Sequence, residues 1–283
     1  MTTDFLPTNE GKMANRMSDG NAFAVLHGTG RFWAIGSVHG EAKRLRTLHD
    51  RLADRLQPKD RLVYLGNYLG YGPDVVGTVD EILSFRRAFL ARPPYTDVSD
   101  FVLLRGSQEE MWQRVLHLQF AIDPVKVMMW MVERGLAATL SAYAGEDAAN
   151  TLTSRAGPLT IAQWTRAIRD AMQTLPGHAA FMSTLKRAAY TSKEGLLFVN
   201  TGIDIERAVT EQSDAFWWAG KSFSRIAAPY GNFAKVIRGY DPDQGGFVET
   251  EYTMTVDGGC GFDGPLIAVC LTREGRIIDR LEA

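Results

Sequence analysis

Three glycine-rich segments constrain the fold of this chain most, because each directly follows a short apolar run. They are residues 36–40 (GSVHG), 66–72 (GNYLGYG) and 106–109 (GSQE). The runs before them, residues 32–35, 61–65 and 101–104, have the length and the apolar content of buried strands. Glycine at the end of a strand permits a tight turn, so the sequence predicts three strands that each end in a sharp loop.

Amphipathic helices are predicted between these strands. Four leucines between positions 45 and 56, and a second apolar series between positions 75 and 89, recur at three- and four-residue spacing. The order is therefore βαβαβ, with each glycine-rich loop at the carboxyl end of a strand. In open α/β sheets the loops at that end converge on a crevice, which is where ligands bind.

The second half of the chain predicts a helical insertion followed by another sheet. Residues 109–190 are rich in Met, Trp and Ala, and we expect them to form helices that cover the pocket. The cluster at positions 128–131 (MMWM) is either a partner surface or helix core, and we favour core. Strand-like runs follow at 196–199, 234–237, 252–256 and 266–271 with few helices between them, which favours a second sheet packed on the first.

Length and composition predict one soluble domain. The 283 residues are 45% hydrophobic and 23% charged with a net charge of −2, so no basic field for nucleic acid or for an anionic membrane is expected. The two cysteines have no metal-binding or disulfide spacing, which suits the cytoplasm. We interpret residues 1–22 as a polar tail without a signal or transmembrane segment, and residues 23–283 as a single domain.

Six short segments together resemble motifs of the calcineurin-like metallophosphoesterases, in particular the bacterial serine/threonine phosphatase and diadenosine tetraphosphatase branch. The three loops resemble the GDxHG, GDxxDRG and GNHE motifs of that family. Residues 198–202 (FVNTG), 237–242 (IRGYDP) and 256–259 (VDGG) resemble its FVHAG, GHTP and IDTG motifs. The resemblance implies an α/β fold, a four-layer αββα sandwich, and a site in which two divalent metals such as Mn, Fe or Zn activate water for attack on phosphorus.

The resemblance also implies which residues occupy the metal-ligand positions, and only one keeps the family residue. These six positions hold Ser37, His39, Asn67, Ser107, Asn200 and Tyr240. Three supporting positions differ as well. Gly70 replaces the Asp that orients the general acid, Tyr71 replaces a phosphate-clamping Arg, and Gln108 replaces the general-acid His. Because a second-shell change alone costs about 10–100-fold in metal affinity, we expect no bound metal and no catalytic residue.

Three hypotheses for function follow. The first is a catalytically inactive homologue that acts as a binding or regulatory module. The second is a phosphoesterase with a rebuilt site that uses His39, and the third is a scaffold that pairs with an intact relative through the helical insertion. For the first, we expect phosphate, a nucleotide or a phosphopeptide to be held by loop N–H groups, Ser37 and Asn200, with Arg105 or Arg238 close by. The alternative for the pocket is a cleft filled by Tyr68, Tyr71 or Tyr240.

Overall fold

Two β-sheets pack face to face in the computed structural model, which describes residues 22–28, 30–93, 96–150, 157–192 and 195–283. Among these residues one sheet has six strands in the order β1-β5-β6-β7-β9-β8, and the other has five in the order β11-β10-β2-β3-β4. The bounds are β1 (Phe23–Leu26), β2 (Phe32–Ile35), β3 (Arg61–Tyr64), β4 (Phe101–Leu103), β5 (Ala188–Thr191), β6 (Leu196–Val199), β7 (Lys235–Arg238), β8 (Val248–Glu249), β9 (Thr253–Thr255), β10 (Ile267–Leu271) and β11 (Ile277–Glu282).

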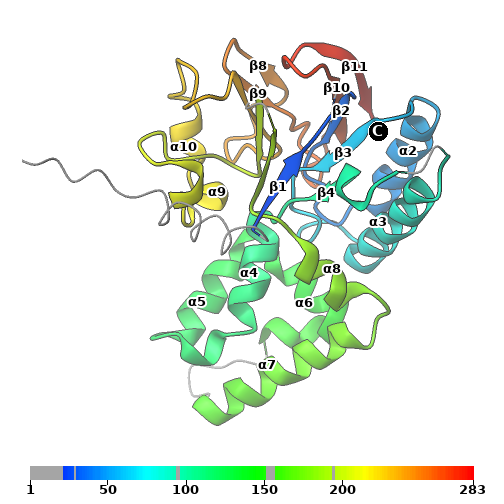
Figure 1. Ribbon diagram of the computed structural model, residues 1–283. Helices are drawn as coiled ribbons and strands as arrows, with labels where there is room; N and C mark the ends of the chain where they lie inside the picture. The colour runs from blue at the N-terminus through cyan, green and yellow to red at the C-terminus, as the bar shows by residue number, and fades with distance from the viewer. Residues whose placement is uncertain (1–21, 29, 94–95, 151–156, 193–194) are drawn as a thin grey trace, which may run out of the picture.

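Helices cover the outer face of each sheet, and a separate group of helices forms a lobe beside the sandwich (Figure 1). The α-helices are α2 (Ala42–Ala53), α3 (Val75–Leu90), α4 (Ser107–Val115), α5 (Pro124–Met131), α6 (Ala137–Ala144), α7 (Pro158–Gln173), α8 (His178–Thr184), α9 (Ala215–Trp218) and α10 (Gly220–Phe223). Shorter helical turns are η1 (Val98–Asp100), η2 (Leu118–Phe120), η3 (Val132–Leu136), η4 (Glu146–Asn150) and η5 (Val209–Glu211).

Strand alternation creates three apolar interfaces, one between each pair of layers. In β2, Trp33 and Ile35 point toward α2 and α3, whereas Phe32 and Ala34 point between the sheets. In β6, Phe198 points between the sheets, and its neighbours belong to the cluster that packs against α9 and α10. Successive side chains on a strand face opposite ways, so an entirely apolar strand serves two interfaces at once. The predicted four-layer αββα fold is confirmed.

Two predicted segment boundaries differ from those in the structure. The insertion was expected to span residues 109–190, but its last helix, α8, ends at Thr184, and residues 188–190 belong to β5. Residues 1–21 of the predicted tail lie outside the described residues. Ala22 is not part of a tail, because its carbonyl accepts a hydrogen bond from the Arg187 N–H beside β1.

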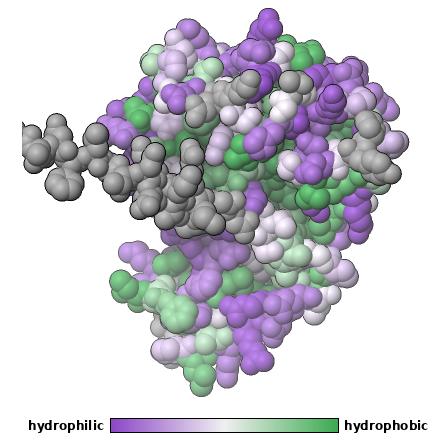
Figure 2. Space-filling model, viewed as in Figure 1, coloured by the Kyte–Doolittle hydropathy of each residue, from purple (hydrophilic) through white to green (hydrophobic). Residues whose placement is uncertain are grey.

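The methionine-rich segment is only half core. Met128 and Met131 are buried, as expected, but Met129 and Trp130 of the same helix, α5, are exposed. In the view of Figure 2, apolar and polar side chains are mixed over the helical lobe. Within the described residues, no helix combines the length and the apolar character that crossing a bilayer requires.

The three predicted strand ends meet, as the βαβαβ order requires. Strands β2, β3 and β4 are parallel neighbours, so their carboxyl ends lie at one edge of the five-stranded sheet. The loops after β6 and β7 of the other sheet reach the same place, because the Ser37 N–H donates to the Gly239 carbonyl and the Gly239 N–H donates to the Asn200 carbonyl. The two sheets therefore share one loop cluster.

Candidate functional site

Backbone conformation in the loop cluster is unusual at three of the predicted site positions. His39, Asn67 and Tyr71 have φ angles of 51°, 58° and 51°, in the left-handed region that residues other than glycine rarely adopt. Each such residue costs of order 1 kcal/mol and persists only where surrounding structure enforces it. Here the Val38 and His39 N–H groups both donate to the Asn67 carbonyl, which ties the first loop to the second.

Asn67 is the centre of a buried network of hydroxyl and amide groups. Its Nδ2 donates to Ser37 Oγ at 3.3 Å, and its Oδ1 accepts from Ser107 Oγ at 3.1 Å and from the Gln108 N–H at 3.1 Å. Asn200 Oδ1 accepts from the Ser107 N–H at 3.1 Å. The structure thus brings together residues up to 163 positions apart, from Ser37 to Asn200, and their polar groups bond to one another.

Glu109 holds the second loop in place, a role that the sequence did not reveal. Its buried carboxylate accepts from the N–H groups of Asn67, Tyr68, Leu69 and Gly106 at 2.8–3.0 Å. Burial raises the pKa of the Glu109 carboxyl, and the four donors offset part of that effect. The sequence showed Glu109 only as the last residue of the third glycine-rich segment. Four strong hydrogen bonds instead make it an anchor for the loop that contains Asn67 and Gly70.

His39 lies inside a group of aromatic rings. Its ring centroid is 5.2 Å from that of Tyr71, 5.3 Å from Tyr240 and 5.5 Å from Phe262, all in edge-to-face orientations. The sequence predicted tyrosines as one way to fill this space, but it did not point to Phe262. The only signal was the density of glycines around Phe262, between positions 258 and 264, which lets that loop fold back. We call these three rings the aromatic plug.

The imidazole of His39 makes no hydrogen bond of normal geometry within the described residues. It is 1% exposed, and neither Nδ1 nor Nε2 has a hydrogen-bond partner of normal geometry. Burial lowers the pKa of His39 to about 3, and the nearby backbone of Leu69 offsets only part of this shift. The ring is therefore neutral at physiological pH and is held by shape. Tyr240 also has a raised pKa because of burial, so its hydroxyl stays protonated.

The helical lobe closes over the other predicted positions. Gln108 Nε2 donates to the Arg134 carbonyl at 2.7 Å, the Gly70 N–H donates to Thr139 Oγ1 at 3.0 Å, and the Tyr71 N–H donates to the Gly135 carbonyl at 3.3 Å. A Cβ atom on Gly70 would lie 2.4 Å from Gln108 Oε1, so glycine at this position leaves room for the glutamine. Two of these contacts come from η3, where the chain is kinked at Arg134 and Gly135, and the third comes from Thr139 of α6.

The two candidate arginines are engaged in structural contacts. Arg238 is buried: its guanidinium donates to Thr255 Oγ1 at 2.9 Å, pairs with Asp241 at 3.0 Å and lies over the Phe223 ring. Arg105 is partly exposed and lies 3.5 Å from Glu110. Arg238 therefore braces β7 and α10, while Arg105 lies at the margin of the loop cluster.

The residues present do not fit a binuclear metal centre. Hydroxyl and amide groups stand where the resemblance implies carboxylate and imidazole ligands, and they are already bonded to each other. Nearby, Asp257 accepts from the N–H groups of Asp241 and Gly259, so its carboxylate is also in use. No group of three or more His, Cys, Asp or Glu side chains in the described part of the chain is arranged to hold a metal ion.

Comparison with known proteins identifies the fold. No protein-family model matches the sequence, and no curated protein does. Among solved structures, a protein assigned as a diadenosine tetraphosphatase is 18% identical, with a TM-score of 0.54 over 93% of this chain and 98% of the other. A serine/threonine phosphatase from Saccharomyces cerevisiae, similar to human phosphatase PP5, is 11% identical, with a TM-score of 0.53 over 99% of this chain and 91% of the other.

These similarities extend over almost the whole chain and define it as a protein with the phosphoesterase α/β sandwich. More particularly, the fold is the one that these two phosphatases have, in agreement with the α/β sandwich predicted from the six motif segments. At these identities the likeness concerns the fold. The replaced positions of the loop cluster are the evidence for what this chain does with that fold.

Proposed function

We propose that this chain is a non-catalytic member of the phosphoesterase fold that acts as a binding or regulatory module. The observation that carries the proposal is the state of the loop cluster. Where the resemblance implies metal ligands, Ser37, Asn67, Ser107 and Asn200 form a closed hydrogen-bond network, and the one remaining histidine is enclosed by the aromatic plug.

Charge supports the proposal. A two-metal site needs negative ligands to offset the cost of dehydrating two dications, and the network of Asn67 supplies only neutral groups. General acid catalysis needs a group that gives up a proton near neutral pH, which the amide of Gln108 cannot do. His39 is a poor replacement, because its pKa of about 3 leaves it without a proton to donate at pH 7.

The kind of ligand is suggested by the structural neighbours, which are named as enzymes that act on phosphorylated compounds. A phosphate-containing ligand is therefore the class that we propose for this chain. Binding at Ser37 and Asn200 requires the network and the plug to open, because these side chains are 2% and 0% exposed. In this proposal the loop cluster is a closed form of the ligand pocket.

Hydrolysis assays test the proposal. We expect no measurable turnover of 4-nitrophenyl phosphate or of diadenosine tetraphosphate with added Mn²⁺, and no difference between the wild type and the His39→Ala variant. The loss of the bridging carboxylate or of the general acid alone removes several orders of magnitude in rate in related chemistry. Turnover that depends on added metal and disappears in His39→Ala would contradict the proposal and restore the rebuilt-enzyme hypothesis.

A further inference from the structure

A hollow separate from the loop cluster has the chemistry of a ligand site. It has a volume of about 570 Å³ and lies between α9, α10 and the segment that follows β7. Its lining includes Trp218, Lys221, Arg225, Pro242 and Asp243. Pockets for small molecules commonly have volumes of about 300–1,000 Å³, so the space suits a ligand of nucleotide size.

The cations of this hollow are available for binding. Within the described residues, the side chains of Lys221 and Arg225 have neither an ion pair nor a hydrogen bond, and both are exposed. Of the two acids in the lining, Asp204 is already paired with Arg207 at 3.1 Å. With Asp204 paired, the lining holds two cations against one further carboxylate, Asp243, so its net charge is positive. A positive concave site favours an anion, and phosphate is a common partner of both lysine and arginine.

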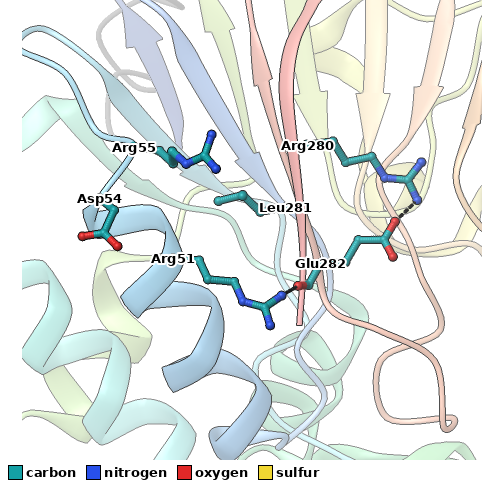
Figure 3. A pocket seen from close by; sticks show the side chains of 6 residues that line it. All are labelled: Arg51, Asp54, Arg55, Arg280, Leu281 and Glu282. Carbon is teal, nitrogen blue, oxygen red and sulfur yellow. Dashed lines mark hydrogen bonds and ion pairs between the residues drawn. The ribbon is translucent and has the colours of Figure 1, made fainter.

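A second hollow provides a comparison, because its cationic side chains are paired with acids or carbonyl groups. It is lined by Arg51, Arg55 and Arg280 together with Asp54 and Glu282 (Figure 3). There Arg51 donates to the Glu282 carbonyl, Arg280 pairs with the Glu282 carboxylate, and Arg55 pairs with Asp279. Its three guanidinium groups are therefore occupied. The Lys221 ammonium and the Arg225 guanidinium of the first hollow are not.

Trp218 provides a fixed aromatic surface in the wall of the hollow. Its indole is 37% exposed, and it contacts Trp130 edge to face at 5.5 Å. The Arg114 guanidinium lies 5.9 Å from the same ring and pairs with Asp214 at 2.6 Å. These contacts hold the indole in place, so little ordering is needed when a planar group stacks on it. Every base has a face that can stack on an aromatic side chain, so such a surface binds nucleotides with little dependence on the base.

The hollow adjoins the loop cluster through Gly220. A Cβ atom on Gly220 would lie 2.8 Å from the Pro242 ring and 3.3 Å from the Thr201 methyl group. Thr201 Oγ1 in turn donates to Asn200 Oδ1 at 2.9 Å. A ligand in the hollow would therefore sit one residue layer from the buried network.

We propose that this hollow binds a nucleoside phosphate. The base stacks on Trp218, and the phosphate groups bind Lys221 and Arg225. The Asp243 carboxylate makes no hydrogen bond among the described residues, only a charge interaction with Arg238, and it accepts from a ribose hydroxyl or a base amine. This site goes beyond the proposed function, since binding here requires neither a metal nor turnover.

Calorimetric titration of the full chain with ADP, adenosine and inorganic phosphate tests the site. We expect ADP to bind with a Kd below about 1 mM and at least tenfold more tightly than either adenosine or phosphate, because only ADP uses both halves of the site. The charge reversal Lys221→Glu with Arg225→Glu, and separately Trp218→Ala, should each weaken ADP binding by about tenfold or more.

Matched controls separate the site from general electrostatics and from misfolding. Lys43→Glu with Arg87→Glu makes the same charge change at exposed positions of α2 and α3, on the opposite layer of the sandwich, and should leave the Kd unchanged. Circular dichroism melting of each variant checks folding, and Trp218→Phe, which keeps an aromatic face, should retain most of the affinity.

The proposal is overturned if ADP does not bind at millimolar concentration, if adenosine binds as tightly as ADP, or if the charge reversal in the hollow and the control reversal have equal effects. Hydrolysis assays are not part of the readout, so this result and the test of the proposed function are independent.

Discussion

Two regions of the molecule treat a buried histidine in opposite ways. On the α3 side, His49 Nδ1 lies 2.6 Å from Glu81 and its Nε2 lies 2.8 Å from the Tyr64 hydroxyl. In the loop cluster, His39 is equally buried, but neither of its ring nitrogens makes a hydrogen bond of normal geometry within the described residues. The difference teaches that burial alone does not make a histidine structural. Its polar partners do.

A second buried histidine, His178 of α8, also has polar partners, one of which lies on α3. His178 Nδ1 lies 2.7 Å from the Tyr143 hydroxyl, and its Nε2 lies 3.2 Å from Asp80. Asp80 and Glu81 are adjacent, so α3 presents neighbouring carboxylates to two Tyr–His pairs. These imidazoles connect helices to the five-stranded sheet and to the lobe. The His39 imidazole forms no such link, and the aromatic plug surrounds it.

The largest effect is expected at the anchor of the loop cluster. Glu109→Ala leaves four buried N–H groups without an acceptor, and we expect it to lower the free energy of unfolding by about 3–5 kcal/mol. Urea denaturation followed by circular dichroism measures the change. The neighbouring Glu110→Ala, which removes only partly exposed ion pairs with Arg105 and Arg114, should cost about 1 kcal/mol or less. Equal losses of unfolding free energy for the two substitutions would show that Glu109 does not anchor the loop.

The same substitution at two histidines tests the comparison itself. His49→Leu leaves Tyr64 and Glu81 without their partner and should cost about 2–3 kcal/mol of unfolding free energy. His39→Leu removes two unsatisfied nitrogens and should be neutral or stabilising by about 1 kcal/mol. Chemical denaturation of both variants at pH 7.5 measures the pair. A larger loss for His39→Leu than for His49→Leu would show that His39 has a partner in solution.

The pH dependence of stability gives a further test. The pKa of His39 is lowered to about 3 in the folded state, whereas the unfolded chain has a histidine pKa near 6.5. As the pH falls below about 6.5, His39 binds a proton in the unfolded state but not in the folded state. The free energy of unfolding therefore decreases until the pH reaches about 3. Between pH 7 and pH 5 the His39 contribution to this loss should be about 2 kcal/mol. His39→Leu should remove that part, and parallel stability–pH curves for the variant and the wild type would contradict the buried neutral state of His39.

Much of the fold could be predicted from sequence because apolar runs ending in glycine carry a strong local signal. The runs that became β2, β3 and β4 were found in this way. Strands β1, β5, β8 and β11 were not, since their pairing comes from partners distant in sequence or from an exposed edge. The exposed alternation of β11 and the two-residue β8 give little hydrophobic pattern to detect.

The sequence could predict which residues form the candidate site. It could not predict whether the pocket between them is open or closed. The resemblance assigned Ser37, Asn67 and Asn200 to one location, and the structure places their side chains in one network. Whether that location is open or closed depends on long-range packing. The contacts of Phe262 and of Gly135 that close it arise from a glycine-rich loop and from a kink between two helices, neither of which has a periodic signature. The role of Glu109 was also not predictable, because three of the four N–H groups that donate to its carboxylate lie about forty residues away in the sequence.

Metal content tests the central claim most directly. The loop cluster lacks the charged ligands of a two-metal centre, so the purified protein, dialysed without chelator after growth with Mn, Fe and Zn supplied, should contain well under one of these ions per chain by elemental mass spectrometry. His39→Leu should contain the same background amount. About two ions per chain in the wild type, lost in His39→Leu, would contradict the account and show that the loops around Asn67 open to hold a catalytic metal pair.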